Sequence, residues 1–318
     1  MQLKHPLLKL RTRYCADTLS AEVRALPPSA WLPHPGSYPG NDAVPLIGKD
    51  GQPSNAFYGR MLPTEHLRRC PYITEIMADI GAVWGRSRLM GLAPGAEVPP
   101  HVDVHYHWRT HMRVHIPVIT NPGVVFTVGG KSVHMAPGEC WVFDSFMLHD
   151  VQNRGSDKRI HLVLDTVGGG RLWELVKEAE EAGPADPEPD VAKLGQGRSN
   201  ELAFEQFNAP GVMSPWEIRC HIGYILEKAP AEPLLDRVFR RMDKFAEEWN
   251  GAWAQFGQSD LGIPTYQNLL SQVQRDLKTL PGAEVKLPNA VPVGRVFQEL
   301  IFNVALPMTP VVPAGPAG

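Results

Sequence analysis

The chain has 318 residues, of which 43% are hydrophobic, 8% aromatic and 20% charged. This composition is typical of a soluble globular protein and excludes collagen-like, coiled-coil and wholly disordered chains. The formal net charge of −3 at pH 7 gives no general attraction to nucleic acid or anionic lipid, so neither is expected as a partner.

No membrane span is predicted, because apolar residues nowhere run together over the roughly 18 positions that a bilayer requires. The N-terminal segment 1–15 interleaves charges with leucines and lacks the apolar core of a signal peptide. The four cysteines form no CxxC pair, which indicates reduced, buried thiols rather than a disulfide framework or a zinc ribbon. These features together predict a cytoplasmic protein.

The first hundred residues mix turn signals with short apolar runs. Proline and glycine dominate residues 33–42, which are expected to form a loop. Thr64 and Glu65 open a predicted helix that runs through Ile80, with its apolar side chains on one face at helical spacing.

From Arg86 to Asp165 the sequence changes to short alternating runs rich in β-forming residues. Strands are predicted at 87–92, 104–107, 112–119, 124–128, 132–135, 140–143 and 160–166. The segment Val128-Gly-Gly-Lys131 predicts a two-residue hairpin turn. Short strands with closely spaced turns indicate a sandwich or barrel of the jelly-roll type.

Helical patterns return after residue 170. Helices are predicted at 171–182, 215–228, 231–256 and 264–280, and the second begins with the cap residue Ser214 followed by Pro215. The expected division is a β-rich domain over 1–182, a stiff acidic linker over 183–213, a C-terminal helical domain over 214–306 and a flexible tail over 307–318. The helical domain is expected to cap the mouth of the barrel or to form a homodimer interface.

Histidine is concentrated in one part of the chain, since eight of the twelve histidines lie between residues 101 and 161. His101 and Asp103 form an H-x-D pair on predicted extended chain, where alternation directs both side chains to one face. His149, which follows a predicted strand and turn, is the third candidate ligand. Two histidines and a carboxylate form the facial triad of non-haem Fe(II) oxygenases, which leaves coordination positions open.

Arg159 follows His149 by ten residues and opens a predicted strand. Its planar guanidinium can pair bidentately with a ligand carboxylate. An H-x-D pair, a distant histidine and then an arginine is the order expected of a site for iron and 2-oxoglutarate, because the far carboxylate of that co-substrate requires a buried cation. The sequence therefore predicts His101, Asp103 and His149 as the catalytic metal ligands and Arg159 as the anchor of 2-oxoglutarate.

Arg113 and His115 share one face of the predicted strand 112–119, and the apolar residues between them share the other. A cation and an imidazole that face the metal would contact a carboxylate of 2-oxoglutarate or of the substrate. The alternative is a buried arginine paired with an acid such as Glu139 or Asp144. The sequence leaves both interpretations open.

The other histidines of this region are assigned to solvent or to structure. Three are expected to be solvated or to line the entrance of the site: His105, His107 and His111. His134 is expected to be structural. Three tryptophans of the helical region are expected in its core: Trp216, Trp249 and Trp253.

A set of motifs runs through the β-rich region: Leu92-Ala-Pro-Gly-Ala-Glu-Val-Pro-Pro-His101-Val-Asp103, Arg113-Val-His115-Ile-Pro117, Gly138-Glu-Cys-Trp141, His149-Asp-Val-Gln-Asn153 and Arg159-Ile-His161-Leu-Val-Leu-Asp165. Upstream stand Trp31-Leu-Pro-His34 and Cys70-Pro71-Tyr72. Over about residues 30–170 these motifs resemble the aspartyl/asparaginyl β-hydroxylase family. That family is a branch of the Fe(II)/2-oxoglutarate dioxygenases which also holds bacterial free-proline cis-4-hydroxylases.

The resemblance implies a cupin-like double-stranded β-helix, with iron held by the H-x-D pair and His149 and with 2-oxoglutarate anchored by Arg159. Arg113 and His115 match the R-x-H strand that faces co-substrate or substrate in relatives. Animal peptide hydroxylases of the family carry glycine in place of the carboxylate ligand, so Asp103 indicates the bacterial branch, which acts on amino acids or small amides. The implied reaction uses O₂ to hydroxylate an unactivated C–H bond and releases succinate and CO₂.

Three alternatives remain open on the sequence. The same chemistry could act on a peptidyl or carrier-tethered residue, with the C-terminal helices as a docking surface. The ligands could belong to a cupin-like metalloenzyme of another class, such as a zinc or manganese isomerase or hydrolase, although Arg159 favours an oxoglutarate enzyme. The β-sandwich could also be a binding module without catalysis, in which the H-x-D pair is incidental.

Overall fold

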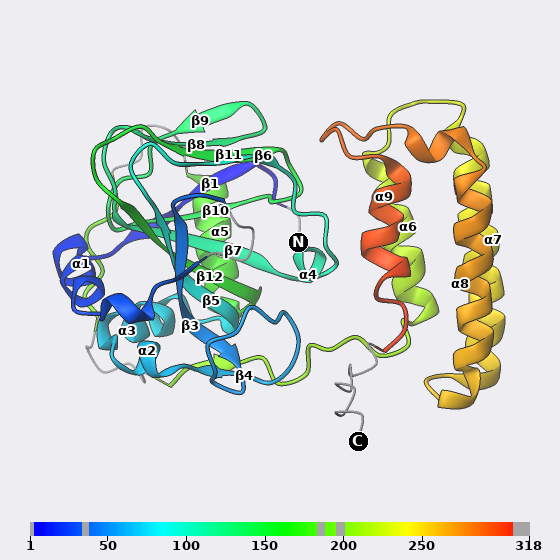
Figure 1. Ribbon diagram of the computed structural model, residues 1–318, viewed down its shortest axis with the longest axis horizontal. Coiled ribbons are helices and arrows are strands. Elements are labelled where there is room, and N and C mark those ends of the chain that lie inside the picture. The colour runs from blue at the N-terminus through cyan, green and yellow to red at the C-terminus, as the bar shows by residue number, and fades with distance from the viewer. Residues whose placement is uncertain (1–2, 34–37, 183–187, 195–200, 308–318) are drawn as a thin grey trace, which may run out of the picture. The chain divides into compact units, whose positions relative to one another are not determined.

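The structure is a computed structural model that describes residues 3–33, 38–182, 188–194 and 201–307. The chain divides into a first unit, Met1–Asp103 with His107–Asn208, and a second unit, Val104–Tyr106 with Ala209–Gly318. The first unit is rich in strands and the second is helical (Figure 1). None of the described helices is both long and apolar enough to cross a membrane.

Some of the sequence predictions fall on residues that the structure does not describe. His34, parts of the predicted linker (183–187 and 195–200) and most of the predicted tail (308–318) lie outside the described residues.

Two sheets form the framework of the first unit. The larger sheet has the strand order β1 (Leu7–Arg13), β10 (Glu139–Phe143), β7 (Met112–Ile119), β12 (Arg159–Gly168), β5 (Val83–Leu92), β3 (Asn41–Lys49) and β2 (Leu32–Pro33), with β4 (Met61–Pro63) beside β3 and β13 (Ala203–Phe204) beside β5. The smaller sheet has the order β6 (Glu97–His101), β11 (His149–Asn153), β8 (Val124–Val128) and β9 (Lys131–Val133). All described pairs are antiparallel except β13 with β5. The predicted double-stranded β-helix is confirmed.

Helices cover one face of the larger sheet. Apolar residues of α1 (Ala16–Arg24), α3 (Pro71–Ile80) and α5 (Gly170–Glu181) share one buried cluster with Val114 and Ile116 of β7. Because side chains alternate along a strand, the neighbouring Arg113 and His115 face the opposite side, toward the smaller sheet. The alternation predicted for this strand is therefore observed, and it places polar side chains between the sheets.

The hairpin between β8 and β9 turns at Gly129 and Gly130, as predicted. Both residues have positive φ angles, 55° and 79°, which the tight turn requires and which glycine adopts without steric cost.

The predicted helix over 65–80 is two helices, α2 (Glu65–Arg68) and α3. Pro71 occupies the first turn of α3, where it is tolerated because it needs no hydrogen-bond donor there. The residue before a proline is biased away from helical geometry, and Cys70 has φ −120° and ψ 72°. The break between the two helices therefore lies at this proline.

The strand predicted over 104–107 is absent. Residues 104–106 form no strand, and α4 (His107–Thr110) follows them. The pairing of β6 with β11 ends at His101, so the chain leaves the smaller sheet before the predicted strand begins. The alternation of residue types therefore predicted a strand that does not form, because no neighbouring strand is available for pairing.

The second unit contains α6 (Pro215–Lys228), α7 (Leu235–Phe256), α8 (Ile263–Lys278) and α9 (Val293–Phe297), which continues as a π-helical turn over Gln298–Phe302. The predicted cap of α6 is observed, since Ser214 Oγ accepts a hydrogen bond from the backbone N–H of Glu217 at 3.2 Å.

Trp249 is fully buried, Trp253 is half-buried and Trp216 is 76% exposed. The prediction of a core position was wrong for Trp216, which lies in the first turn of α6.

Cys70 and Cys140 are buried thiols, as expected, whereas Cys15 and Cys220 are only half-buried; all four are free.

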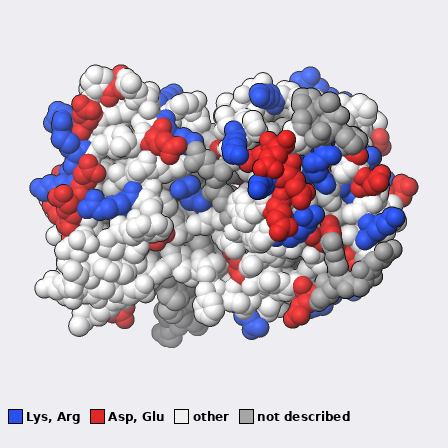
Figure 2. Space-filling view, turned by 180° about the vertical axis from the view of Figure 1, so that it is seen from behind, with Lys and Arg blue, Asp and Glu red and all other residues white. Residues whose placement is uncertain are grey.

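Charges of both signs are interspersed over the face shown in Figure 2. This pattern agrees with the nearly balanced total of 31 Lys and Arg against 34 Asp and Glu. The described surface in that view shows no broad field of a single sign that would attract a polyanion.

Candidate functional site

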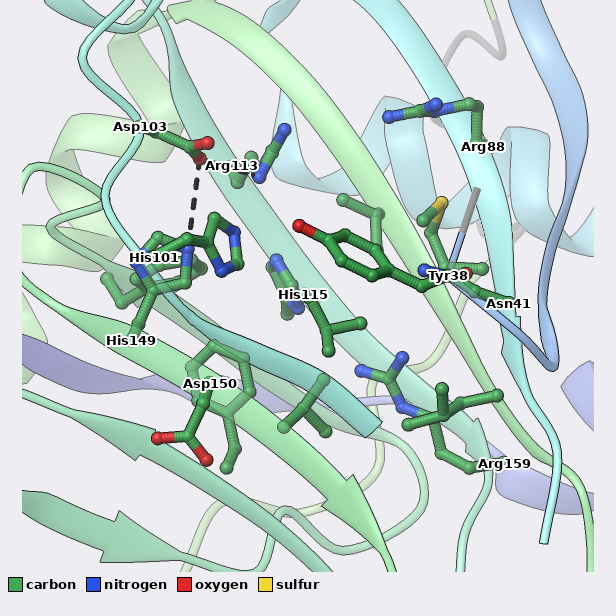
Figure 3. A pocket seen from close by; sticks show the side chains of 17 residues that line it. Tyr38, Asn41, Arg88, His101, Asp103, Arg113, His115, His149, Asp150 and Arg159 are labelled. Atoms are coloured by element: carbon green, nitrogen blue, oxygen red, sulfur yellow. Dashed lines mark hydrogen bonds and ion pairs between the residues drawn. The ribbon is translucent and has the colours of Figure 1, made fainter. Parts of the chain in front are cut away.

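The three predicted metal ligands come together at one end of a cavity between the two sheets (Figure 3). His101 ends β6 and His149 begins β11, and the two residues are partners in the register of these strands. One ligand atom from each of His101, Asp103 and His149 lies within 4.8 Å of the others. The centroids of the two imidazole rings are 4.2 Å apart.

The backbone orients both imidazoles in the same way. His101 Nδ1 lies 2.9 Å from the carbonyl oxygen of Pro99, and His149 Nδ1 lies 2.8 Å from that of Met147. A carbonyl oxygen can only accept, so each Nδ1 carries the proton and each Nε2 presents a lone pair to a metal. Burial lowers the pKa of His149 to about 4, which keeps this ring neutral at pH 7.

Arg113 connects Asp103 to a second carboxylate. Arg113 Nη1 donates to Asp103 Oδ2 at 2.8 Å, and Arg113 Nε donates to Asp165 Oδ1 at 3.3 Å. The ring of Trp108 lies 3.7 Å from the guanidinium carbon. Arg113 is thus held on three sides, and its acidic partners are not the two that the sequence suggested.

Those two suggested acids have other partners. Glu139 pairs with Lys9, and Asp144 accepts a hydrogen bond from the backbone N–H of Phe146. Arg113 therefore satisfies both sequence interpretations in part, since it lines the cavity and is also paired with acids.

Asp165 is the buried counter-charge of this cluster and is only 2% exposed. It also accepts hydrogen bonds from Arg86, with Nη2 at 3.3 Å, and lies 3.7 Å from His107 Nε2. Burial alone would raise the pKa of Asp165, but His107, Arg113 and Arg86 outweigh it and hold the pKa well below its usual range. Asp165 is therefore an anion at neutral pH and neutralises cations beside the metal ligands.

His107 and His111 were expected to be solvated or to line the entrance of the site. This prediction was wrong, because both are buried and neither lines the cavity. The two rings stack at 3.6 Å, and their residues are 1% and 6% exposed. His111 Nε2 lies 2.5 Å from Glu205 Oε1, a partner 94 residues away in the sequence. His105 is half-buried, and exposed His134 has Nδ1 3.0 Å from the carbonyl oxygen of Val124. The buried pair is explained by carboxylates that only the tertiary fold brings close.

Arg159 lies away from the three candidate ligands, farther along the same cavity (Figure 3). It is 5% exposed, and burial lowers its pKa to about 9, so the guanidinium stays charged at pH 7. Arg159 Nη2 donates to His161 Nδ1 at 2.6 Å. Within the described residues no carboxylate pairs with Arg159, and its Nε has no hydrogen-bond partner. A buried cation in this condition is stabilised by an anion bound beside it.

His115 lies between the three candidate ligands and Arg159 (Figure 3). It is 6% exposed, and both of its ring nitrogens lack a hydrogen-bond partner among the described residues. Burial, followed by the nearby charges of Arg159 and Arg113, lowers the pKa of His115 well below its ordinary value. A neutral imidazole with unused nitrogens therefore faces the cavity and can bind a polar ligand.

The cavity has a volume of about 240 Å³ and is lined by all six of the predicted site residues. This volume is below the roughly 300–1,000 Å³ of pockets for drug-sized ligands, so the cavity suits small molecules. Sequence reasoning missed four polar residues of its lining: Tyr38, Asn41, Arg88 and Asp150. Arg88 had a usable signal, because two arginines at alternate positions, Arg86 and Arg88, share one face of a strand whose ends are apolar.

The family model described as aspartyl/asparaginyl beta-hydroxylase matches residues 56–168. The resemblance inferred from the sequence is thereby confirmed over that segment, which contains all three candidate ligands and Arg159.

Two curated relatives are also similar to this chain. An L-proline cis-4-hydroxylase of Rhizobium meliloti is 30% identical over 107 residues, which cover 33% of this chain and 38% of that protein. An L-proline cis-3-hydroxylase of a Streptomyces species is 26% identical over 146 residues, which cover 43% of this chain and 49% of that protein. The chain thus spans less than half the length of each of these relatives.

Among solved structures, the chain is similar to an oxidoreductase of the 2OG-Fe(II) oxygenase family from Burkholderia pseudomallei. The two share 16% identity with a TM-score of 0.37, and the match covers 49% of this chain and 80% of the other.

Proposed function

We propose that this chain, whose residues 56–168 match the model of the aspartyl/asparaginyl β-hydroxylase family, is an Fe(II)/2-oxoglutarate-dependent dioxygenase. Its substrate is an amino acid or a small amino-acid derivative, which it hydroxylates at an unactivated C–H bond. One observation carries the proposal: a single cavity has two histidines and a carboxylate at one end and, elsewhere in its wall, a buried arginine that no carboxylate of the described residues pairs with. The amino-acid substrate is supported by the two similar proteins named as proline hydroxylases.

The residues present fit both groups that this reaction needs. His101, Asp103 and His149 offer one metal-binding atom each, and the set of two imidazoles and one carboxylate suits Fe(II) with open positions. Arg159 would take the far carboxylate of 2-oxoglutarate, and the unused ring nitrogens of His115 would contact a polar group of a ligand beside it. Bound iron with 2-oxoglutarate would activate O₂, which is the oxidant of this reaction, because amino-acid side chains provide no oxidising power for attack on a C–H bond.

The chain's own residues would position the metal ligands and the substrate and would exclude water from the reacting bond. Arg113 holds the Asp103 carboxylate, which belongs to a loop, against strand β7 of the larger sheet. Phe126, Phe143 and Val163 supply apolar wall between the polar groups. Such a wall keeps unproductive water away from the reacting bond and aligns one C–H bond of the substrate.

The test is turnover of 2-oxoglutarate with Fe(II) across a panel of free amino acids and small amides. We expect succinate to form, and a product heavier than its substrate by one oxygen atom to appear with at least one panel member. His149→Ala is expected to abolish both signals. Absence of succinate with every panel member would overturn the proposal.

A cupin-like isomerase or hydrolase is the second candidate. It would use the same metal ligands, but it gives Arg159 no anion to bind. Turnover that needs the metal and not 2-oxoglutarate would support this second candidate.

A further inference from the structure

Arg88 is a second buried arginine of the cavity wall. It lies on β5, is 5% exposed and lines the same cavity as Arg159. Its one hydrogen bond to a described residue joins Nη1 to Asn55 Oδ1 at 3.3 Å. Across the described ranges, no carboxylate forms an ion pair with Arg88.

The charges on this face of the larger sheet do not balance around Arg88. Asp165 is shared by Arg86 and Arg113, and Asp103 is bound by Arg113 and is also a candidate metal ligand. Both carboxylates are therefore already engaged. Burial, with added repulsion from Arg86 and Arg113, lowers the pKa of Arg88 well below its ordinary value. An anion bound beside it would relieve this repulsion.

One bound dicarboxylate cannot pair with the metal ligands, with Arg159 and also with Arg88. Arg88 pairs in register with Val163 of β12, whereas Arg159 pairs with Leu92 of β5. Positions 88 and 92 are separated by about 13 Å along an extended strand. Figure 3 accordingly shows Arg88 and Arg159 at separate places in the cavity wall, with Tyr38 near the line between them. A co-substrate that reaches from the metal ligands to Arg159 leaves Arg88 for a different anion.

We infer that Arg88 binds a carboxylate of the substrate and thereby selects acids over the corresponding neutral amides. This inference rests on the proposed function, because it assigns 2-oxoglutarate to Arg159. The carboxylate has two possible sources, the α-carboxylate of a free amino acid or the side chain of an acidic residue. A neutral ligand at this position would leave the guanidinium buried without a counter-charge.

The experiment measures binding rather than turnover. Protein loaded with Mn(II) and 2-oxoglutarate is titrated by calorimetry with three sets of probes: free L-amino acids including proline, their carboxamides, and N-acetyl-L-aspartate amide. We expect at least one acid to bind about 10- to 150-fold more tightly than its amide, the range expected of a hydrogen bond to a charged group. Preference for free amino acids assigns the α-carboxylate, and binding of the aspartate derivative alone assigns the acidic side chain.

Variants locate this preference. Arg88→Gln is expected to reduce the acid-to-amide ratio of affinities to near one, and Arg88→Lys to restore part of it. Arg154→Gln, the same change at an exposed arginine, should leave the ratio as in the wild type. The ratio compares two ligands on one protein, so a general loss of folded protein does not change it.

The outcomes separate this inference from the proposed function. Equal affinities for acids and amides, binding of no probe, or a preference that survives in Arg88→Gln would each overturn the role of Arg88. Discrimination that depends on Arg88, together with no succinate from the Fe(II) protein, would overturn the proposed reaction and leave the carboxylate site in place.

Discussion

The guanidinium of Arg113 joins a candidate metal ligand to the interior of the larger sheet. Its Nη1 lies 2.8 Å from Asp103 Oδ2 and its Nε lies 3.3 Å from Asp165 Oδ1. Asp103 follows the end of β6 and has no strand partner, whereas Arg113 and Asp165 are register partners on β7 and β12. The position of the loop carboxylate therefore depends on a pair of charges that the sheet itself holds.

Asp165→Asn is expected to lower the free energy of unfolding by about 3–5 kcal/mol, because it leaves the buried Arg86 and the half-buried Arg113 with too little negative charge. Urea denaturation checks this. Glu188→Gln is the matched control, since Glu188 pairs with Lys9 at the surface with 63% of its side chain exposed, and its loss should cost under about 1 kcal/mol. Equal effects of the two substitutions would contradict the role given to Asp165.

His101→Ala and His149→Ala are each expected to weaken Fe(II) binding by more than about 100-fold. Loss of a residue that only orients a metal ligand weakens metal binding by about 10- to 100-fold, and loss of the ligand itself should weaken it more. Asp103→Ala should weaken binding less, because the resemblance to the β-hydroxylase family implies that members with glycine at this position are active. Anaerobic calorimetry measures the affinities. His134→Ala removes an exposed histidine of the same region and should leave the Fe(II) affinity unchanged. An Fe(II) affinity that neither His101→Ala nor His149→Ala changes would refute the assignment of the ligands.

Arg159→Gln is expected to raise the 2-oxoglutarate concentration for half-maximal succinate formation by about 10- to 150-fold. The reason is that the buried guanidinium has no carboxylate partner within the described residues and would lose its anion-binding charge. Binding of Mn(II) without 2-oxoglutarate should persist, because Arg159 is not among the three candidate ligands. Loss of Mn(II) binding together with 2-oxoglutarate binding would indicate a general structural role instead.

Local pattern was sufficient for much of the fold. Strands β7 and β8 and helix α6 have the predicted bounds, because each combines regular alternation or spacing with a clear turn or cap. The six predicted site residues all line one cavity, because five of them lie on strands that pair and Asp103 follows directly after the end of β6.

The features that the sequence did not predict depend on contacts between residues that are far apart in the chain. Strand β1 was not predicted, and it is held by pairing of Leu7 with Phe143, far along the sequence. His107 and His111 look like solvated histidines until Asp165 and Glu205 are brought beside them. Arg88 had a signal in its alternation with Arg86, but only the three-dimensional structure shows that no carboxylate of the described residues pairs with it.

Stability is expected to fall on acidification of the metal-free protein. Burial lowers the pKa of His107 to about 4, in a setting that also holds Asp165, His111 and Arg86. Between about pH 4 and pH 6.5 the unfolded chain binds a proton that the folded protein excludes, so the free energy of unfolding rises with pH in this window. The contribution of His107 is about 1.4 kcal/mol per pH unit.

His107→Gln should therefore flatten the pH dependence of the free energy of unfolding by about that slope between pH 4.5 and pH 6. Urea denaturation at several pH values measures it, with circular dichroism at pH 7.5 as the check that the variant is folded. An unchanged slope would mean that His107 does not exclude the proton.

Two glycines with the same backbone angle separate steric clash from backbone strain. Gly138 and Gly130 both have φ of 79°, but a Cβ on Gly138 would meet the carbonyl oxygen of Tyr14 at 2.2 Å, whereas one on Gly130 would meet nothing within 4 Å. Gly130→Ala should cost about 1–2 kcal/mol of unfolding free energy from the left-handed conformation alone. Gly138→Ala should cost about 1–3 kcal/mol more, because the backbone of Tyr14 must move and its N–H donates to the Gly138 carbonyl. Denaturant titration compares the free energies of unfolding of the two variants. Equal decreases would show that the backbone between β1 and α1 moves away from the added Cβ at no cost.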